Sequence, residues 1–331
     1  MRLNKRASLL FLICLTAYLL LSLAVSFLLR RGGSYDLTFL LSAVAVSLPA
    51  FFVPALIFRR REGFARFKAP RFSHIMLCAA IGIGTVYLNQ ALSMLNGALL
   101  YNVDVESNSI TAQTIAELNP LNMLLSLAII PPISEEFLMR GTLLESWRRY
   151  SPWGAAVVTA LFFALLHTAP SSLLVYFVLG LLLAAVYLIT RNVWLSVTVH
   201  FVNNFFSVAA ALLLRFGAFA GLDGADAGEI AELMTGSPVS MLLASMLYAG
   251  LAAALLVPLF FVLRGIYRRN KLGAYSEEVY PEGSRIAAEP LYDPDTGEKL
   301  SMWSDPILWV TLGLLIVLNV ISGLQEFGVI G

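Results

Sequence analysis

The chain has 331 residues, of which 59% are hydrophobic and 13% are charged, and its formal net charge is +1. Charged residues make up about a quarter of an ordinary soluble domain, so this composition excludes that class of protein. The small net charge gives no reason to expect a nucleic acid or a strongly acidic partner. We therefore expect an integral membrane protein surrounded by the lipid bilayer.

Apolar segments close to the length of a transmembrane helix, about 20 residues, recur along the chain. They cover residues 8–29, 37–58, 74–95, 121–147, 153–169, 171–189, 193–214, 239–263 and 306–324. Two of them, 153–169 and 171–189, are short and nearly contiguous, which leaves about eight to nine helices. The sequence predicts an all-α, polytopic transmembrane helical bundle that forms a single membrane domain over residues 1–331.

Basic residues collect in cytoplasmic loops, and the densest basic cluster of this chain follows the second apolar segment. It comprises Arg59, Arg60, Arg61, Arg66, Lys68 and Arg71. Alternation from this loop predicts a cytoplasmic N-terminus and external loops near residues 96–120 and 215–238. The polar stretch 264–305 is expected to be a cytoplasmic loop that precedes an extra final span at 306–324.

Three ionisable residues interrupt the apolar segment 121–147: Glu135, Glu136 and Arg140. A charge at the centre of a membrane helix costs about 2.5–3.5 kcal/mol, so these groups should be paired, hydrated or functional. Glu136 and Arg140 are four residues apart, the spacing of an intrahelical ion pair, whereas Glu135 is turned about 100° away. This pattern predicts a neutral Glu136–Arg140 pair and a free Glu135 carboxylate for proton transfer, with the reverse assignment of the two glutamates left open.

The dipeptide Pro131–Pro132 lies just before the glutamates. Proline has no amide donor and disfavours helix in the residue before it. We expect the span to break there and a second helical segment to begin around Pro132. The glutamates would then lie in its first turn, where free amides and the helix dipole favour carboxylates.

His167 and His200 also lie in or next to predicted spans, and Asn204 shares the helical face of His200. Interhelical hydrogen bonding is the common use of any one such residue alone. As a set with the two carboxylates, they predict a polar cavity within the bundle.

Converging groups of these types can hydrolyse a carbonyl compound, and two versions stay open. In the first, Glu135 is the general base and His167, His200 and Asn204 donate hydrogen bonds to the oxyanion. In the second, His167, His200 and Glu135 hold Zn²⁺, which acidifies a bound water. The residues themselves do not choose between the metal-free and the zinc-dependent version.

The motifs Glu135-Glu136-x-x-x-Arg140, Phe163-x-x-x-His167 and His200-x-x-x-Asn204 together resemble the signature of the CPBP family of intramembrane proteases. That family includes CAAX prenyl endopeptidases and bacterial proteins linked to bacteriocin processing or self-immunity. The resemblance covers about residues 121–210. It implies a membrane endopeptidase whose site opens to the cytosol, with Glu135 as base, both histidines and Asn204 around the water or metal, and Glu136 and Arg140 in support.

The resemblance leaves the substrate open: a peptide or a membrane protein, prenylated or not. The expected location is a bacterial plasma membrane. Two other classes of function stay as alternatives. One is a non-catalytic immunity or scaffold protein whose polar core fixes helix packing, and the other is a proton-coupled transporter, since Glu and His at membrane depth form proton relays. The lack of an internal repeat in the sequence weakens the transporter alternative.

Overall fold

The computed structural model describes residues 3–29, 35–61, 69–103, 118–148, 150–215, 235–272 and 301–329. Within these ranges all regular elements are helical. Eight helical stretches of the described chain are long and apolar enough to cross a membrane, and Pro152–Leu166 is a shorter apolar helix. The predicted all-α transmembrane bundle is therefore confirmed.

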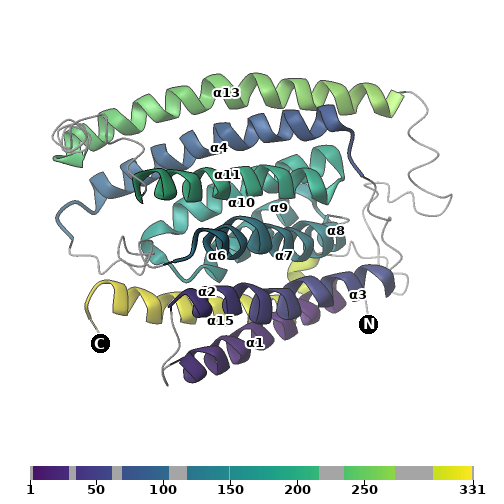
Figure 1. Cartoon of the computed structure of the whole chain (residues 1–331). Coiled ribbons are helices and arrows are strands. Elements are labelled where there is room, and N and C mark those ends of the chain that lie inside the picture. The colour runs from purple at the N-terminus through teal and green to yellow at the C-terminus, as the bar shows by residue number, and fades with distance from the viewer. Residues whose placement is uncertain are drawn as a thin grey trace.

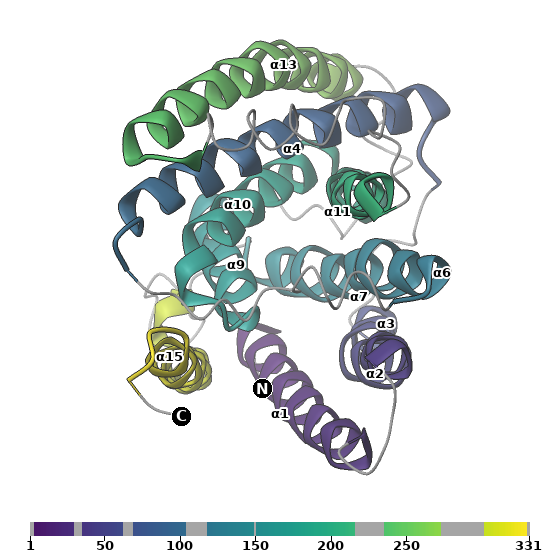
Figure 2. The ribbon, with the colours of Figure 1, turned by 60° about the vertical axis from the view of Figure 1, so that its left-hand side comes forward.

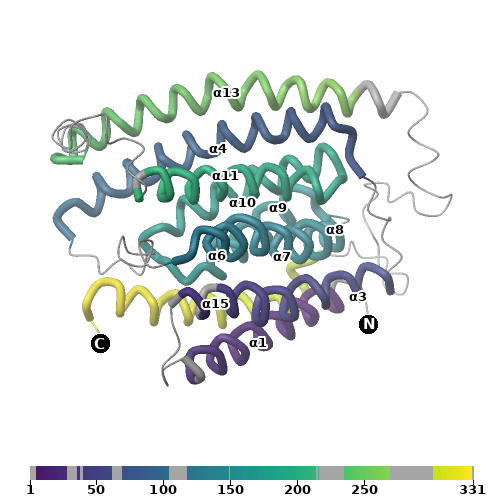
Figure 3. Tube along the Cα trace, in the orientation of Figure 1, coloured from purple at the N-terminus to yellow at the C-terminus, as the bar shows by residue number. Residues whose placement is uncertain are grey.

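The chain can be followed as a trace in Figure 3. In order, its elements are α1 (Leu3–Leu29), α2 (Tyr35–Leu41), η1 (Ser42–Phe52), α3 (Val53–Arg61), α4 (Phe72–Leu99), α6 (Pro120–Met123), η2 (Leu124–Ile129), α7 (Ile130–Leu138), η3 (Met139–Leu144), α8 (Glu145–Trp147), α9 (Pro152–Leu166), η4 (Pro170–Ser172), α10 (Leu173–Thr190), α11 (Val193–Arg215), α13 (Pro238–Leu272), η5 (Met302–Ser304) and α15 (Pro306–Glu326). The elements η1, η2 and η3 are π-helical, and η4 and η5 are short 3₁₀ turns.

The long helices run roughly alongside one another in layers (Figure 1). Helix α13 packs along α4, and α4 packs along α11. The stretch from α6 to α8 lies between α11 and η1, with α9 and α10 beside it. On the far side, α1 contacts both η1 and α15, as the turned view shows (Figure 2). The stretch that carries Glu135 and Glu136 is thus enclosed by other helices.

Helices α4 and α11 approach closely at Gly82. A Cβ atom placed on Gly82 would lie 2.7 Å from the Val202 Cβ atom. Membrane helices associate through packing and hydrogen bonds, and small residues at the contact let the backbones come near. This contact helps to fix α11, the helix that carries His200, against the outer pair α4 and α13.

The predicted helix break at Pro131–Pro132 is wrong. The helical stretch is continuous from Pro120 to Trp147, with the π-helical η2 directly before the prolines and α7 beginning at Ile130. The wider π turn accommodates residues that cannot make the usual i→i−4 bond. Glu135 and Glu136 therefore lie in the interior of α7, so a free helix N-terminus is not what stabilises their charges.

The predicted loop at 264–305 begins later than expected, because α13 continues to Leu272. The rest of it, 273–300, lies outside the described residues. So do 62–68, 104–117 and 216–234, which contain much of the other predicted loops. The predicted orientation, including the cytoplasmic N-terminus, depends on charges in these loops and stays a prediction.

Candidate active site

Glu136 and Arg140 form the predicted ion pair. Arg140 Nη1 lies 2.9 Å from Glu136 Oε1, and both side chains are 0% exposed. Arg140 Nη2 donates a second hydrogen bond, 2.9 Å long, to the carbonyl oxygen of Gly180 on α10. The guanidinium also stands over the Phe163 ring, 4.9 Å from its centroid. Because the charges are buried together, the pair is a neutral unit that joins the Glu136 helix to α9 and α10.

Gly180 is a close-contact position as well as the acceptor for Arg140. A Cβ atom there would lie 3.0 Å from the Ala160 Cα atom on α9. We expect Gly180→Ala to lower the free energy of unfolding by about 1–3 kcal/mol, the usual cost of overpacking. The measurement is detergent-induced unfolding of the purified protein. Gly313→Ala on α15, where nothing lies within 4 Å of the added atom, is the matched control, and equal stability of the two variants would contradict this prediction.

His200 stands between the two glutamates. Its Nδ1 atom lies 3.1 Å from Glu136 Oε1, and its Nε2 atom lies 3.9 Å from Glu135 Oε2. A carboxylate that is paired with an arginine only accepts hydrogen bonds, so Nδ1 carries the hydrogen in this contact. The imidazole is thereby oriented with Nε2 toward Glu135, as a second polar partner often orients a functional histidine.

His167 lies at the C-terminal end of α9, and its ring is held on three sides. Nδ1 donates to the Phe163 carbonyl oxygen at 2.7 Å, which leaves Nε2 as the ring nitrogen that can accept a hydrogen bond. The ring stacks on Tyr176, with centroids 4.0 Å apart, and the Phe163 ring contacts both histidines at 4.7 Å and 5.6 Å. His167 also interacts electrostatically with Glu135, Arg140 and His200.

Five of the six predicted site residues therefore come together from α7, η3, α9 and α11. Within this group Glu135 differs from Glu136 in accessibility, because its side chain is 15% exposed whereas that of Glu136 is 0% exposed. Of the two glutamates, only Glu135 retains a surface that a water or a substrate can reach. The structure thus separates a sealed carboxylate from an accessible one, and the catalytic roles of both stay predictions.

Tyr176 on α10 and Tyr18 on α1 were not found by the sequence reasoning. Tyr176 stacks on His167, and both tyrosines lie within range of the Glu135 charge. A single tyrosine in an apolar span has no spacing that marks it as functional. Only the packing of α1 and α10 around α7 places these hydroxyl groups near the site.

Asn204, the sixth predicted residue, is tied to the backbone of η2. Its Nδ2 atom donates to the Leu127 carbonyl oxygen at 3.0 Å, and its Oδ1 atom accepts from Asn203 at 3.1 Å. In an α-helix Leu127 would accept from residue 131 and in a π turn from residue 132, but both are prolines. The amide of Asn204 replaces the donor that the prolines lack, and its predicted bond to an oxyanion stays a prediction.

The side chains do not form a ready metal site. Among the described residues, no three or more His, Cys, Asp or Glu side chains make a group that could hold a metal ion. The separation of 3.9 Å between Glu135 Oε2 and His200 Nε2 exceeds the roughly 3–3.5 Å expected for two ligands about 2 Å from one tetrahedral zinc. The arrangement of these side chains does not fit a preformed zinc site.

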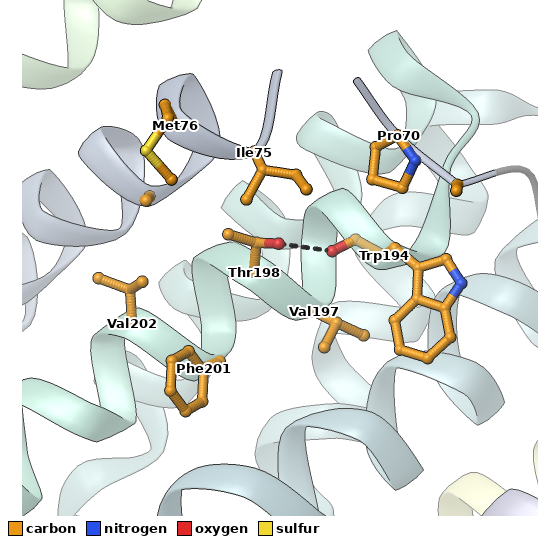
Figure 4. A pocket seen from close by; sticks show the side chains of 10 residues that line it. Pro70, Ile75, Met76, Trp194, Val197, Thr198, Phe201 and Val202 are labelled. Carbon is orange, nitrogen blue, oxygen red and sulfur yellow. Dashed lines mark hydrogen bonds between the residues drawn. The ribbon is translucent and has the colours of Figure 1, made fainter. Parts of the chain in front are cut away.

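An apolar cavity of about 570 Å³ lies between the start of α4 and the first half of α11 (Figure 4). Its lining comprises Ala69, Pro70, Ile75, Met76, Ala79, Trp194, Val197, Thr198, Phe201 and Val202. The Thr198 hydroxyl donates to the Trp194 carbonyl oxygen at 2.8 Å, so it adds little free polarity. The Trp194 ring contacts Phe137, the residue after Glu136, with ring centroids 5.1 Å apart. One lining ring therefore contacts the helix that carries both glutamates, and none of the six predicted site residues lines the cavity itself.

Comparison with known proteins gives one family match. Residues 117–206 match the model of a family described as Rce1-like, type II CAAX prenyl endopeptidase Rce1-like. No curated protein and no solved structure matches the chain. The match confirms over this segment the resemblance that the motifs indicated, and it contains all six predicted site residues. Helices α1, α4, α13 and α15 lie outside it.

Proposed function

We propose that this chain is an intramembrane endopeptidase that hydrolyses a peptide bond with a water activated by Glu135. The observation that carries this proposal is the convergence of an accessible carboxylate with two imidazoles beside a sealed ion pair. These groups belong to a segment that matches an endopeptidase family. An ion pair alone does not require two histidines near an accessible carboxylate, but water activation does.

In this mechanism the hydrolytic water lies between Glu135 and the histidines. The 3.9 Å between Glu135 Oε2 and His200 Nε2 is too long for a direct hydrogen bond and suits a bridging water. Glu135 takes a proton from this water as the water oxygen attacks the carbonyl carbon of the peptide bond. The same proton then passes to the departing amide nitrogen, and the C–N bond breaks.

The tautomers of the histidines refine their proposed part. Nδ1 carries the hydrogen in both rings. A neutral ring therefore accepts a hydrogen bond from the water at Nε2 and orients it. Only a protonated ring donates from Nε2 to the developing oxyanion. In the proposed cycle, neutral histidines thus position the water, and protonated histidines stabilise the oxyanion.

The substrate that we propose is a peptide or membrane-protein segment with an apolar or lipid-modified part. The apolar cavity between α4 and α11 supports this class, since its Trp194 ring contacts Phe137 on the helix that carries both glutamates. A site open to the cytosol is also part of the proposal. His200 lies seven residues after the start of α11 at Val193, about 10 Å along the axis, at the end predicted to be cytoplasmic.

Peptide cleavage by the purified protein in lipid nanodiscs tests this function. We expect cleavage within a library that contains prenylated and unmodified peptides, and an unchanged rate after dialysis against a chelator. The reason for the second expectation is that the described side chains do not make a three-ligand metal group. A rate that falls with chelator and returns with Zn²⁺ would instead favour the metal-dependent version.

Three further results would decide the class of function and the use of the apolar cavity. Wild-type protein that cleaves nothing in the library would contradict the endopeptidase proposal and favour the scaffold alternative. Cleavage of the prenylated peptides alone would assign the apolar cavity to the lipid group. Equal cleavage of both sets would assign it to apolar side chains.

A further inference from the structure

The last helix, α15, bonds to the backbone of the segment that carries His167. Asn319 Nδ2 donates to the Leu165 carbonyl oxygen at 2.7 Å, and Ser322 Oγ donates to the Thr168 carbonyl oxygen at 2.6 Å. The Glu326 carboxylate accepts a bond from the Ser171 amide at 3.2 Å. The Ser171 hydroxyl donates to Glu326 as well. Each pair is separated by 154 or 155 residues in sequence, so these bonds are tertiary and not local.

The bonding side chains lie on one face of α15, since Asn319, Ser322 and Glu326 follow the i, i+3, i+7 spacing. Asn319 and Glu326 are buried. Buried polar groups in an apolar span are unfavourable unless they are bonded, and a buried carboxylate most of all. A helix that needed only to fill the bundle would carry apolar residues on this face, as α15 does elsewhere. The face is therefore suited to holding this loop.

The loop itself has a conformation that needs support. Thr168, directly after His167, has a φ of +46°, in the left-handed region that is strongly disfavoured for a β-branched residue. Such a residue persists only where the surrounding structure holds it. The bond from Ser322 reaches the carbonyl oxygen of Thr168 itself. On the other side of the loop, the Ser171 carbonyl oxygen accepts a bond from Asn96 of α4.

Helix α15 has its own attachment to the bundle, independent of this loop. At its N-terminus the buried Asp305 carboxylate accepts a 2.5 Å hydrogen bond from Ser8 on α1. Along its length Leu308 and Leu315 are buried in the main hydrophobic core. Figure 2 shows α15 beside α1 and below α9. The helix is thus a fixed support, and its polar face can hold the loop in one position.

We propose that α15 positions His167 for catalysis, with Asn319, Ser322 and Glu326 as positioning residues. They hold residues 165–171 so that the His167 ring stacks on Tyr176 and presents Nε2 to the space beside Glu135. This inference rests on the proposed peptidase function. It assigns a role to a helix that lies outside the segment 117–206 matched by the family model.

The test uses Ser322→Ala and Glu326→Ala in the full chain, in nanodiscs. We expect amide hydrogen exchange in residues 167–172 to rise in both variants, because the loop opens locally more often. We expect kcat to fall about 10–100-fold with KM nearly unchanged, since misplacing a catalytic group by about 1 Å costs that much. Glu326→Gln keeps an acceptor oxygen for Ser171 and should restore part of both losses.

The exposed α15 residues Gln325 and Val320 supply the matched controls Gln325→Ala and Val320→Ala, which should behave as wild type in both measurements. Unchanged exchange in the Ser322 and Glu326 variants would overturn the holding role. Increased exchange with wild-type kcat would overturn the positioning of His167. If wild-type protein cleaves no peptide, the peptidase proposal fails and the positioning role fails with it, while the exchange data still decide whether α15 holds the loop.

Discussion

Replacing Glu135 with glutamine is expected to lower kcat by about 10²–10⁴-fold, the contribution of a positioned general base. Glutamine keeps the shape of the side chain and cannot take a proton from water. Glu135 is 15% exposed and lies 3.9 Å from His200 Nε2, so the substitution breaks no tight ion pair. We therefore expect the free energy of unfolding to change by less than about 0.5 kcal/mol. The measurement is single-turnover cleavage together with an unfolding curve.

Glu136→Gln is the companion variant that separates the two carboxylates. Glu136 is sealed and bonded to both Arg140 and His200, so its loss should lower stability and disturb the orientation of His200. Wild-type turnover in Glu135→Gln would contradict the proposed base. If Glu136→Gln alone lost turnover while keeping full stability, the roles of the two glutamates would be reversed.

Arg140→Ala is expected to lower the free energy of unfolding by about 3–5 kcal/mol, the usual cost of removing one partner of a buried ion pair. The change leaves the Glu136 carboxylate enclosed at 0% exposure and removes the side-chain donor of the Gly180 carbonyl oxygen. It also removes the cation over the Phe163 ring, which contacts both histidines. Detergent-induced unfolding of the purified protein measures the loss.

Two variants make this measurement specific to the pair. Arg264→Ala removes an exposed arginine on α13 and should change stability by less than about 0.5 kcal/mol. The double variant Glu136→Gln with Arg140→Met removes both charges and should recover part of the loss, because no unpaired charge stays buried. Equal stability of Arg140→Ala and Arg264→Ala would show that the pair contributes nothing to folding.

Local spacing was enough to predict the ion pair and most of the spans. The four-residue interval between Glu136 and Arg140 places both side chains on one face of any helix, whatever surrounds it. The apolar segments likewise lie where the helices are found, because the bilayer requires continuous apolar runs of a certain length. These features depend on the chain within a few turns and on the solvent, so no tertiary information was needed.

The helix break at Pro131–Pro132 shows where local reasoning failed. The two prolines do lack amide donors, as the sequence indicates, but whether the helix breaks there depends on a residue far away in the sequence. The Asn204 amide, on α11, bonds to the Leu127 carbonyl oxygen that the prolines leave free, and the helix continues through a π turn. A rule about proline in an isolated helix does not include a donor supplied by a neighbouring helix.

The sequence by itself determined that this is a helical membrane protein with a paired Glu136 and Arg140, and it identified His167 and His200 as polar groups in or next to the spans. Only the tertiary structure decided which way these groups point. It turned His200 Nε2 toward Glu135, stacked His167 on Tyr176 and placed α15 against the loop that carries His167. The physical reason is that spacing along one helix fixes a face of that helix, whereas direction toward a partner depends on how separate helices pack.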